Sequence, residues 1–138
     1  MKPIMQTDTT FETGNCGEAC IASILEIELS EIPGFHSDDP QDGAAYCKHI
    51  REFVSRYGLS YVDISFQDGC DPMDFLKDCW TIASGPSPRG TKEWHRHAVV
   101  WRNGEIVHDP HPAGGGLKEI EMYGLFILKN PELAKEKR

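Results

Sequence analysis

Two segments that lie far apart in the sequence carry residue types that together could perform thiol chemistry. Cys16 stands in the run Gly14–Cys20, which opens an apolar helical pattern, while His97 and Asp109 lie twelve residues apart near the other end of the chain. A cysteine reacts as a nucleophile only in its thiolate form, and a helix N-terminus favours an anion. A histidine can serve as the base, and an aspartate can fix the orientation of its ring. The pattern therefore predicts nucleophilic catalysis by Cys16, His97 and Asp109.

Attack of sulfur on a carbonyl carbon creates an oxyanion, which needs hydrogen-bond donors already in place. The backbone N–H of Cys16 is one candidate donor. Gln6 is the second, since an extended segment that begins ten residues upstream can fold back over the helix start. The alternative is that Gln6 is simply an exposed polar residue near the end of the chain.

Helices are expected in the first half of the chain. Apolar residues recur at helical spacing over about 16–27, with Asn15 as the N-cap and Glu18 three residues later in the capping-box relation. A second amphipathic stripe covers about 44–57 and ends at Gly58. These two helices must position the cysteine.

The second half of the chain is typical of an antiparallel sheet. The expected strands and their connections are a strand over 60–66, a short helix starting at Asp71-Pro72, strands over 80–83, 97–101, 105–108 and 123–129, loops over 84–90 and 109–116, and a charged tail over Pro131–Arg138. Helices followed by an antiparallel sheet indicate an α+β fold, with residues 1–138 as a single domain.

The Asn-Gly pair at 103–104 predicts a hairpin whose register decides whether the base and its orienter meet. A two-residue loop places Asp109 opposite Ala98, on the wrong face. A loop one residue longer places His97 directly across from Asp109, with Cβ atoms ~5 Å apart. We therefore predict a three-residue turn, or an equivalent bulge near Pro110.

The charge of the chain argues against nucleic acid as a partner. The net charge is −8, and the first 88 residues hold five Lys/Arg against fifteen Asp/Glu. Nucleic-acid binding needs clustered basic residues. No apolar run approaches the ~20 residues of a membrane span, and the N-terminal residues do not resemble a secretory signal, so we expect a cytoplasmic protein that does not contact a membrane.

The cysteines and histidines give no pattern of a bound metal or other cofactor. Five cysteines, without paired C-x-x-C spacing, argue against both a disulfide framework and a structural zinc site. His95, His97, His108 and His111 lie close in sequence, but their spacing matches no recognised ligand pattern. We therefore predict no metal and no cofactor.

Taken together, these residues resemble the papain-like cysteine peptidases, most closely the bacteriocin-leader-processing type and its stand-alone relatives. The resemblance is carried by Gln6, by Asn15-Cys16-Gly17 at a helix start, by His97 opening a valine-rich strand, and by Asp109-Pro110. It implies a helix packed on an antiparallel sheet, with the active site in the cleft between them. It also implies Cys16 as nucleophile, His97 as base, Asp109 as orienter and Gln6 in the oxyanion hole.

The expected activity is hydrolysis of a peptide, isopeptide or other amide bond in a peptide or protein, through an acyl-enzyme. We expect Asn15, Ser87, Arg89 and Trp94 to face the substrate. Deamidation or acyl transfer would use the same triad with a different acceptor. A papain-like binding module without activity, or a histidine-based metal protein, are the alternatives from other classes. The sequence leaves the oligomeric state open.

Overall fold

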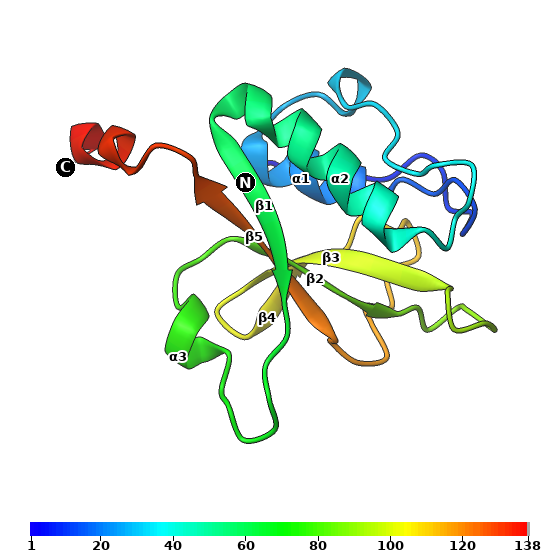
Figure 1. The fold of residues 1–138 in the computed structure, drawn as a ribbon. Helices are drawn as coiled ribbons and strands as arrows, with labels where there is room; N and C mark the ends of the chain where they lie inside the picture. Colours follow the sequence, from blue (N-terminus) through cyan, green and yellow to red (C-terminus); the bar gives the residue numbers. More distant parts are fainter. Residues whose placement is uncertain (138) are drawn as a thin grey trace.

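A computed structural model describes residues 1–137 and has an α+β architecture (Figure 1). Its α-helices are α1 (Cys16–Leu25), α2 (Gly43–Val54) and α3 (Met73–Leu76), and its strands are β1 (Leu59–Ile64), β2 (Thr81–Pro86), β3 (Arg96–Arg102), β4 (Glu105–His108) and β5 (Met122–Leu128). Short 3-10 helices cover Leu29–Glu31, Ser55–Tyr57 and Pro131–Lys137. Arg138, the end of the expected charged tail, lies outside the described residues.

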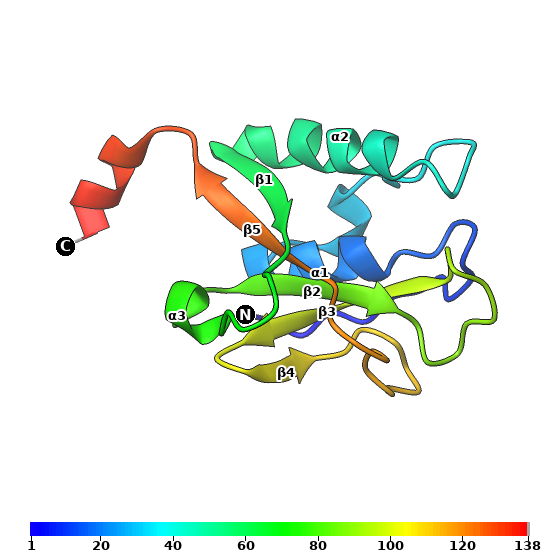
Figure 2. The same ribbon diagram turned by 60° about the horizontal axis from the view of Figure 1, so that its bottom comes forward.

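The five strands form one antiparallel sheet in the order β1-β5-β2-β3-β4. Helices α1 and α2 lie together on one face of this sheet, as Figure 2 shows. α1 packs against β2 and β3, and α2 packs against β1. α1 therefore lies beside β3, the strand that carries His97.

Each face of the sheet has its own hydrophobic core. The core under α1 and α2 contains Cys20, Ile21, Phe35, Ile50, Phe53, Val54, Tyr61, Ile82, Ala98 and Val100. The core on the opposite face contains Leu76, Ala83, Val99, Trp101 and Tyr123. Alternating residues of β3 enter the two cores, which explains why this strand is buried along most of its length.

α2 begins and ends close to where the sequence predicts. The Asp42 side chain accepts a hydrogen bond from the backbone N–H of Ala45, which caps the helix. The final turn tightens into the 3-10 helix Ser55–Tyr57, and Gly58 follows with a φ of 73°. Within residues 1–137, no helix combines the length and apolar character needed to cross a membrane.

The predicted capping box at the start of α1 does not form. Asn15 occupies the N-cap position, but its Oδ1 accepts hydrogen bonds from the backbone N–H groups of Thr7 and Asp8. The Glu18 side chain instead accepts a hydrogen bond from the hydroxyl of Tyr46. Asn15 therefore fastens the N-terminal segment across the helix start rather than capping the helix.

Two of the element boundaries that differ from the expectation have a clear structural cause. α1 ends at Leu25 rather than near residue 27, because Glu26 adopts a left-handed conformation with a φ of 57°. β2 continues through Pro86 into the segment expected as a loop, and Gly85 pairs with His97 there. A Cβ at Gly85 would clash with the carbonyl oxygen of Glu119, so the close approach of these two backbones requires glycine.

The predicted hairpin forms, but the predicted three-residue turn does not. Arg102 pairs with Glu105, which leaves Asn103 and Gly104 as a two-residue turn with φ values of 52° and 84°. The register then shifts between Trp101 and Val100, which makes Val107 an extra residue on β4. One extra residue sends the following side chains to the other face.

The bulge was the alternative to the longer turn, and it lies at Val107 instead of near Pro110. It turns Asp109 to the face on which His97 lies. The two residues are not direct cross-strand partners, yet their side chains meet.

Truncation of Phe35 should strongly destabilise the fold. Its fully buried ring packs against the rings of Tyr46 and Phe53 under the helices. We expect Phe35→Ala to lower the free energy of unfolding by about 3–5 kcal/mol in urea titrations. Phe75→Ala, at a side chain that is 65 % exposed, is the matched control and should change it by less than about 1 kcal/mol. Equal effects of the two substitutions would contradict this description of the core.

Candidate active site

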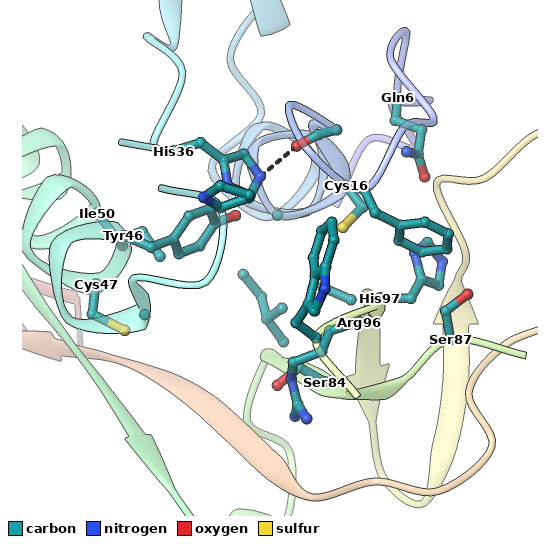
Figure 3. A pocket seen from close by; sticks show the side chains of 18 of the residues that line it. Gln6, Cys16, His36, Tyr46, Cys47, Ile50, Ser84, Ser87, Arg96 and His97 are labelled. Carbon is teal, nitrogen blue, oxygen red and sulfur yellow. Dashed lines mark hydrogen bonds between the residues drawn. The ribbon is translucent and has the colours of Figure 1, made fainter. Parts of the chain in front are cut away.

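A cavity of about 260 Å³ opens between the helices and the sheet, and it brings the two candidate segments together (Figure 3). Cys16, at the first position of α1, and His97, near the start of β3, both line it. Gln6 from the N-terminal segment and Tyr46 from α2 also line it. Residues separated by up to 116 positions in the sequence therefore share one pocket, since the lining runs from Gln6 to Met122.

The side chains of His97 and Asp109 are joined by a direct hydrogen bond. Nε2 of His97 lies 2.7 Å from Oδ1 of Asp109, and the His97 side chain is only 4 % exposed. The Asp109 carboxylate also accepts hydrogen bonds from the backbone N–H groups of His111 and Gly116, at 3.0 and 2.8 Å. Burial raises the pKa of Asp109, but the hydrogen bonds from His97, His111 and Gly116 outweigh it and leave that pKa below its usual value. Asp109 is therefore an anion that holds the ring of His97.

The environment of His97 favours the neutral form of its imidazole ring. Burial lowers its pKa more than the hydrogen bond and the charge of Asp109 raise it, and the nearby charges of Arg89 and His111 lower it further. Because Nε2 bonds Asp109, Nδ1 is the ring nitrogen left to exchange a proton with another group.

The thiol of Cys16 lies close to β3, where the backbone N–H of Ala98 favours the ionised form of the sulfur. Burial raises the pKa of Cys16 to about 11, and the charge of Glu18 adds to this effect. The N–H groups of Ala98, Gly17 and Cys16 itself lower the pKa by less. The expectation that the helix start holds a thiolate is therefore not met, because desolvation outweighs the donors at the helix N-terminus.

Sequence reasoning missed a buried pair beside the thiol. Glu18 is 3 % exposed and accepts a hydrogen bond of 3.0 Å from the hydroxyl of Tyr46 on α2. Burial raises the pKa of Glu18 to about 7. A Cβ at Gly17 would clash with the same hydroxyl, so glycine lets Tyr46 close over the helix start. The two partners are 28 residues apart on different helices, and nothing in the sequence links them.

Gln6 lines the cavity, and its side-chain nitrogen is bonded to the N-terminal segment. Nε2 donates a 2.9 Å hydrogen bond to the carbonyl oxygen of Asp8, and the backbone N–H of Gln6 donates to Pro110. Oε1 is buried and has no hydrogen-bond partner within residues 1–137. The side chain therefore has an unpaired acceptor, and because Nε2 carries a second hydrogen beyond the one bonded to Asp8, its role as an oxyanion donor stays a prediction. The backbone N–H groups that favour the ionised sulfur are those of Ala98 on β3 and of Gly17 and Cys16 in the first turn of α1.

Three of the four residues expected to face a substrate line the cavity. They are Ser87, Arg89 and Trp94. Ser87 Oγ accepts a hydrogen bond from the backbone N–H of Arg89, and the Arg89 guanidinium donates to the carbonyl of Gly114, which ties two loops together at the rim. Asn15 does not line the cavity, because its side chain is committed to Thr7 and Asp8.

The neighbouring histidines have separate structural partners. His108 Nε2 bonds the carbonyl of Ile4, and His95 Nδ1 accepts from the backbone N–H of Thr91. His111 lines the cavity, with its ring 6.1 Å from that of His97. In the described part of the chain, no three His, Cys, Asp or Glu side chains gather as a metal site, and all five cysteines are free thiols.

The raised pKa of Cys16 predicts its reactivity toward iodoacetamide. The thiolate fraction should be small at neutral pH, so Cys16 should be alkylated more slowly at pH 7 than the exposed Cys70 and Cys79 of the same molecule. Its alkylation rate should rise with pH toward a midpoint near 11. Peptide mapping by mass spectrometry at several pH values measures all three thiols together. Alkylation of Cys16 ahead of both controls at pH 6 would instead indicate a resting thiolate.

Comparison with known proteins adds no identification of this site. No family model, no curated protein and no solved structure matches the chain. What the cavity can do is therefore inferred from its own geometry: a thiol, a neutral imidazole and an ionised carboxylate that holds the imidazole.

Proposed function

We propose that this protein is a thiol-dependent hydrolase with a papain-like Cys-His-Asp triad. Its substrate is a peptide, isopeptide or other amide bond of a peptide or protein, and Cys16 forms the acyl-enzyme. The hydrogen bond of His97 to Asp109, in the cavity that Cys16 also lines, is the observation that carries the proposal. A buried imidazole with one nitrogen fixed by a carboxylate is the arrangement expected of an oriented base.

The first step transfers a proton and forms a bond. Nδ1 of His97 takes the proton of the Cys16 thiol while the sulfur attacks the substrate carbonyl carbon. The carbonyl π electrons move to oxygen, and the N–H groups of Cys16 and Gly17 at the start of α1 are the proposed donors to the resulting oxyanion. Asp109 stabilises the imidazolium through Nε2.

The second step releases the amine. The imidazolium returns its proton from Nδ1 to the amide nitrogen, the C–N bond breaks, and a thioester on Cys16 remains. His97 then removes a proton from a water molecule, which attacks the thioester carbonyl. The carboxylic acid leaves and the thiol is restored. A neutral thiol beside a neutral imidazole is a suitable starting state for this sequence, because His97 must be unprotonated to accept the first proton.

A second candidate function is a papain-like binding module without activity. The observation that favours it is the raised pKa of Cys16, since a thiol that is almost entirely protonated at neutral pH is a weak nucleophile. Deamidation and acyl transfer remain variants of the leading proposal, because both pass through the same thioester. Turnover of a substrate would distinguish an enzyme from a binding module. The products would distinguish hydrolysis from deamidation and acyl transfer.

Substitution of the triad should abolish turnover of amide substrates. A positional-scanning library of fluorogenic peptide amides provides the assay. We expect Cys16→Ala and His97→Ala to lower kcat/KM by at least ~10³-fold, because each removes a group that the acyl-transfer step requires. Cys79→Ala, at an exposed cysteine, is the control and should retain full activity. Retained turnover in Cys16→Ala would exclude the proposed nucleophile, and peptide binding without turnover by the wild type would favour the binding module.

The pH dependence of turnover should follow the neutral form of His97. Burial lowers its pKa below 6.5, so the base is protonated only on the acidic side of that value. We expect kcat/KM to rise as the pH increases through a midpoint below 6.5 and then to stay level through pH 8. A profile that rises only above pH 8 would show that the bulk thiolate, rather than the His97 base, limits the reaction.

A further inference from the structure

The candidate active site contains an arginine that pairs with no carboxylate of residues 1–137. Two arginines line the cavity, Arg89 and Arg96. Arg96 forms an ion pair with Glu121, whereas none of the ion pairs in the described part of the chain includes Arg89. A guanidinium is well suited to bind a carboxylate, because its planar N–H groups match the two carboxylate oxygens.

Two loops hold the Arg89 guanidinium at the rim of the cavity. The backbone N–H of Arg89 donates to Oγ of the buried Ser87, which shapes the turn after β2. Nη1 donates to the carbonyl oxygen of Gly114, in the loop after β4. A Cβ at Gly115 would lie 3.0 Å from Nη1, so glycine leaves room for the guanidinium there. This contact uses one of several N–H groups, and the others remain to bind a ligand.

His111 places a second donor beside the proposed base. Its ring centre lies 6.1 Å from that of His97, and both rings line the cavity. Nδ1 of His111 accepts a hydrogen bond from the backbone N–H of Ala113, so the hydrogen of the neutral ring is on Nε2. Burial and the charge of Arg89 lower the pKa of His111, which favours this neutral form. Because the charge of Arg89 also lowers the pKa of His97, the guanidinium acts on both rings.

The proposed mechanism determines which part of a substrate approaches these donors. Nδ1 of His97 returns its proton to the leaving nitrogen, so the leaving amine must lie on the His97 side of Cys16. Figure 3 shows Cys16 between Tyr46 on one side and His97 and Ser87 on the other. In an amino acid the carboxylate carbon is about 2.5 Å from the nitrogen. A carboxylate on the leaving residue is therefore carried toward the side of the cavity that holds the donors.

The carboxylates that line the cavity belong to its other side. They are Asp42, which caps α2, and Asp63 on β1, which accepts a hydrogen bond from Cys47 of α2. A negatively charged leaving residue is repelled from these two groups and attracted to the loops that carry Arg89.

We propose that Arg89 and His111 bind a carboxylate of the leaving residue, and that the protein prefers amide bonds whose leaving residue is negatively charged. This inference rests on the function proposed above. The carboxylate belongs either to the C-terminus of the substrate or to an aspartate or glutamate side chain, which present the same chemistry. Arg89 supplies charge and paired N–H groups, and His111 supplies the N–H of Nε2.

Two pairs of probes that share one acyl group test this preference. N-acetyl-leucyl-glycine is joined to leucine or leucinamide in the first pair, and to the α-amide of glutamate or of glutamine in the second. Release of N-acetyl-leucyl-glycine, followed by mass spectrometry, reports cleavage. We expect kcat/KM for a charged probe to exceed that for its neutral partner by about 10-fold, at a rim that is open to solvent. The pair that shows the preference identifies the source of the carboxylate.

Removal of the guanidinium should abolish the preference. We expect Arg89→Met, which keeps the long side chain without its charge, to lower kcat/KM for the preferred charged probe by about 10-fold and that for its neutral partner by less than about 2-fold. Arg89→Lys keeps the charge and should retain part of the preference. His111→Ala should cause a smaller loss of the same kind. Lys92→Met, at an exposed lysine in the loop after Arg89, is the matched control and should change neither rate.

The outcomes separate this inference from the proposed function. Equal losses for a charged probe and its neutral partner in Arg89→Met would show that Arg89 only holds the two loops together, and would overturn the inference. It would also be overturned, with the hydrolase intact, by a wild type that forms a thioester on Cys16 from an activated ester but cleaves neither charged probe faster than its neutral partner. If no thioester forms and no probe or library peptide is cleaved, the hydrolase proposal fails and the inference fails with it.

Discussion

The hydrogen bond of 2.7 Å between Nε2 of His97 and Oδ1 of Asp109 constrains the rest of the candidate site. It requires the two side chains to lie on one face of the β3–β4 hairpin. The single bulge residue Val107 turns Asp109 to the face on which His97 lies. It also commits Nε2, so any proton exchange with the thiol must use Nδ1. Without this contact the imidazole would have neither a fixed orientation nor a partner for its charge.

Burial shifts the pKa values of Cys16 and His97 in opposite directions. It raises the pKa of Cys16 to about 11 and lowers that of His97, so that both groups rest in their neutral forms. The N-terminal segment contributes to this burial, because Asn15 fastens Thr7 and Asp8 across the start of α1. A neutral pair favours proton transfer during the attack over a permanent ion pair, which is consistent with general-base catalysis.

Local patterns allowed much of the architecture to be predicted, since apolar periodicity placed both long helices and the Asn-Gly pair at 103–104 placed the hairpin. The contact between His97 and Asp109 was predicted by counting which face of the hairpin each side chain must occupy. The predicted turn was wrong, because a bulge at Val107 leaves no signal in a strand of four residues. The orientation of the Gln6 amide and the position of Asn15 depend on tertiary hydrogen bonds. Such contacts overrode the local capping preference, as tertiary context commonly does.

Detection of the acyl-enzyme tests the central claim most directly. Wild type is mixed with the 4-nitrophenyl ester of N-acetyl-leucyl-glycine, quenched in acid and mapped by mass spectrometry. The account predicts one acyl group on Cys16 that hydroxylamine removes, as expected of a thioester, and that His97→Ala no longer forms on the same timescale. Release of nitrophenol without an adduct on Cys16, or an adduct that forms equally fast in His97→Ala, would contradict it.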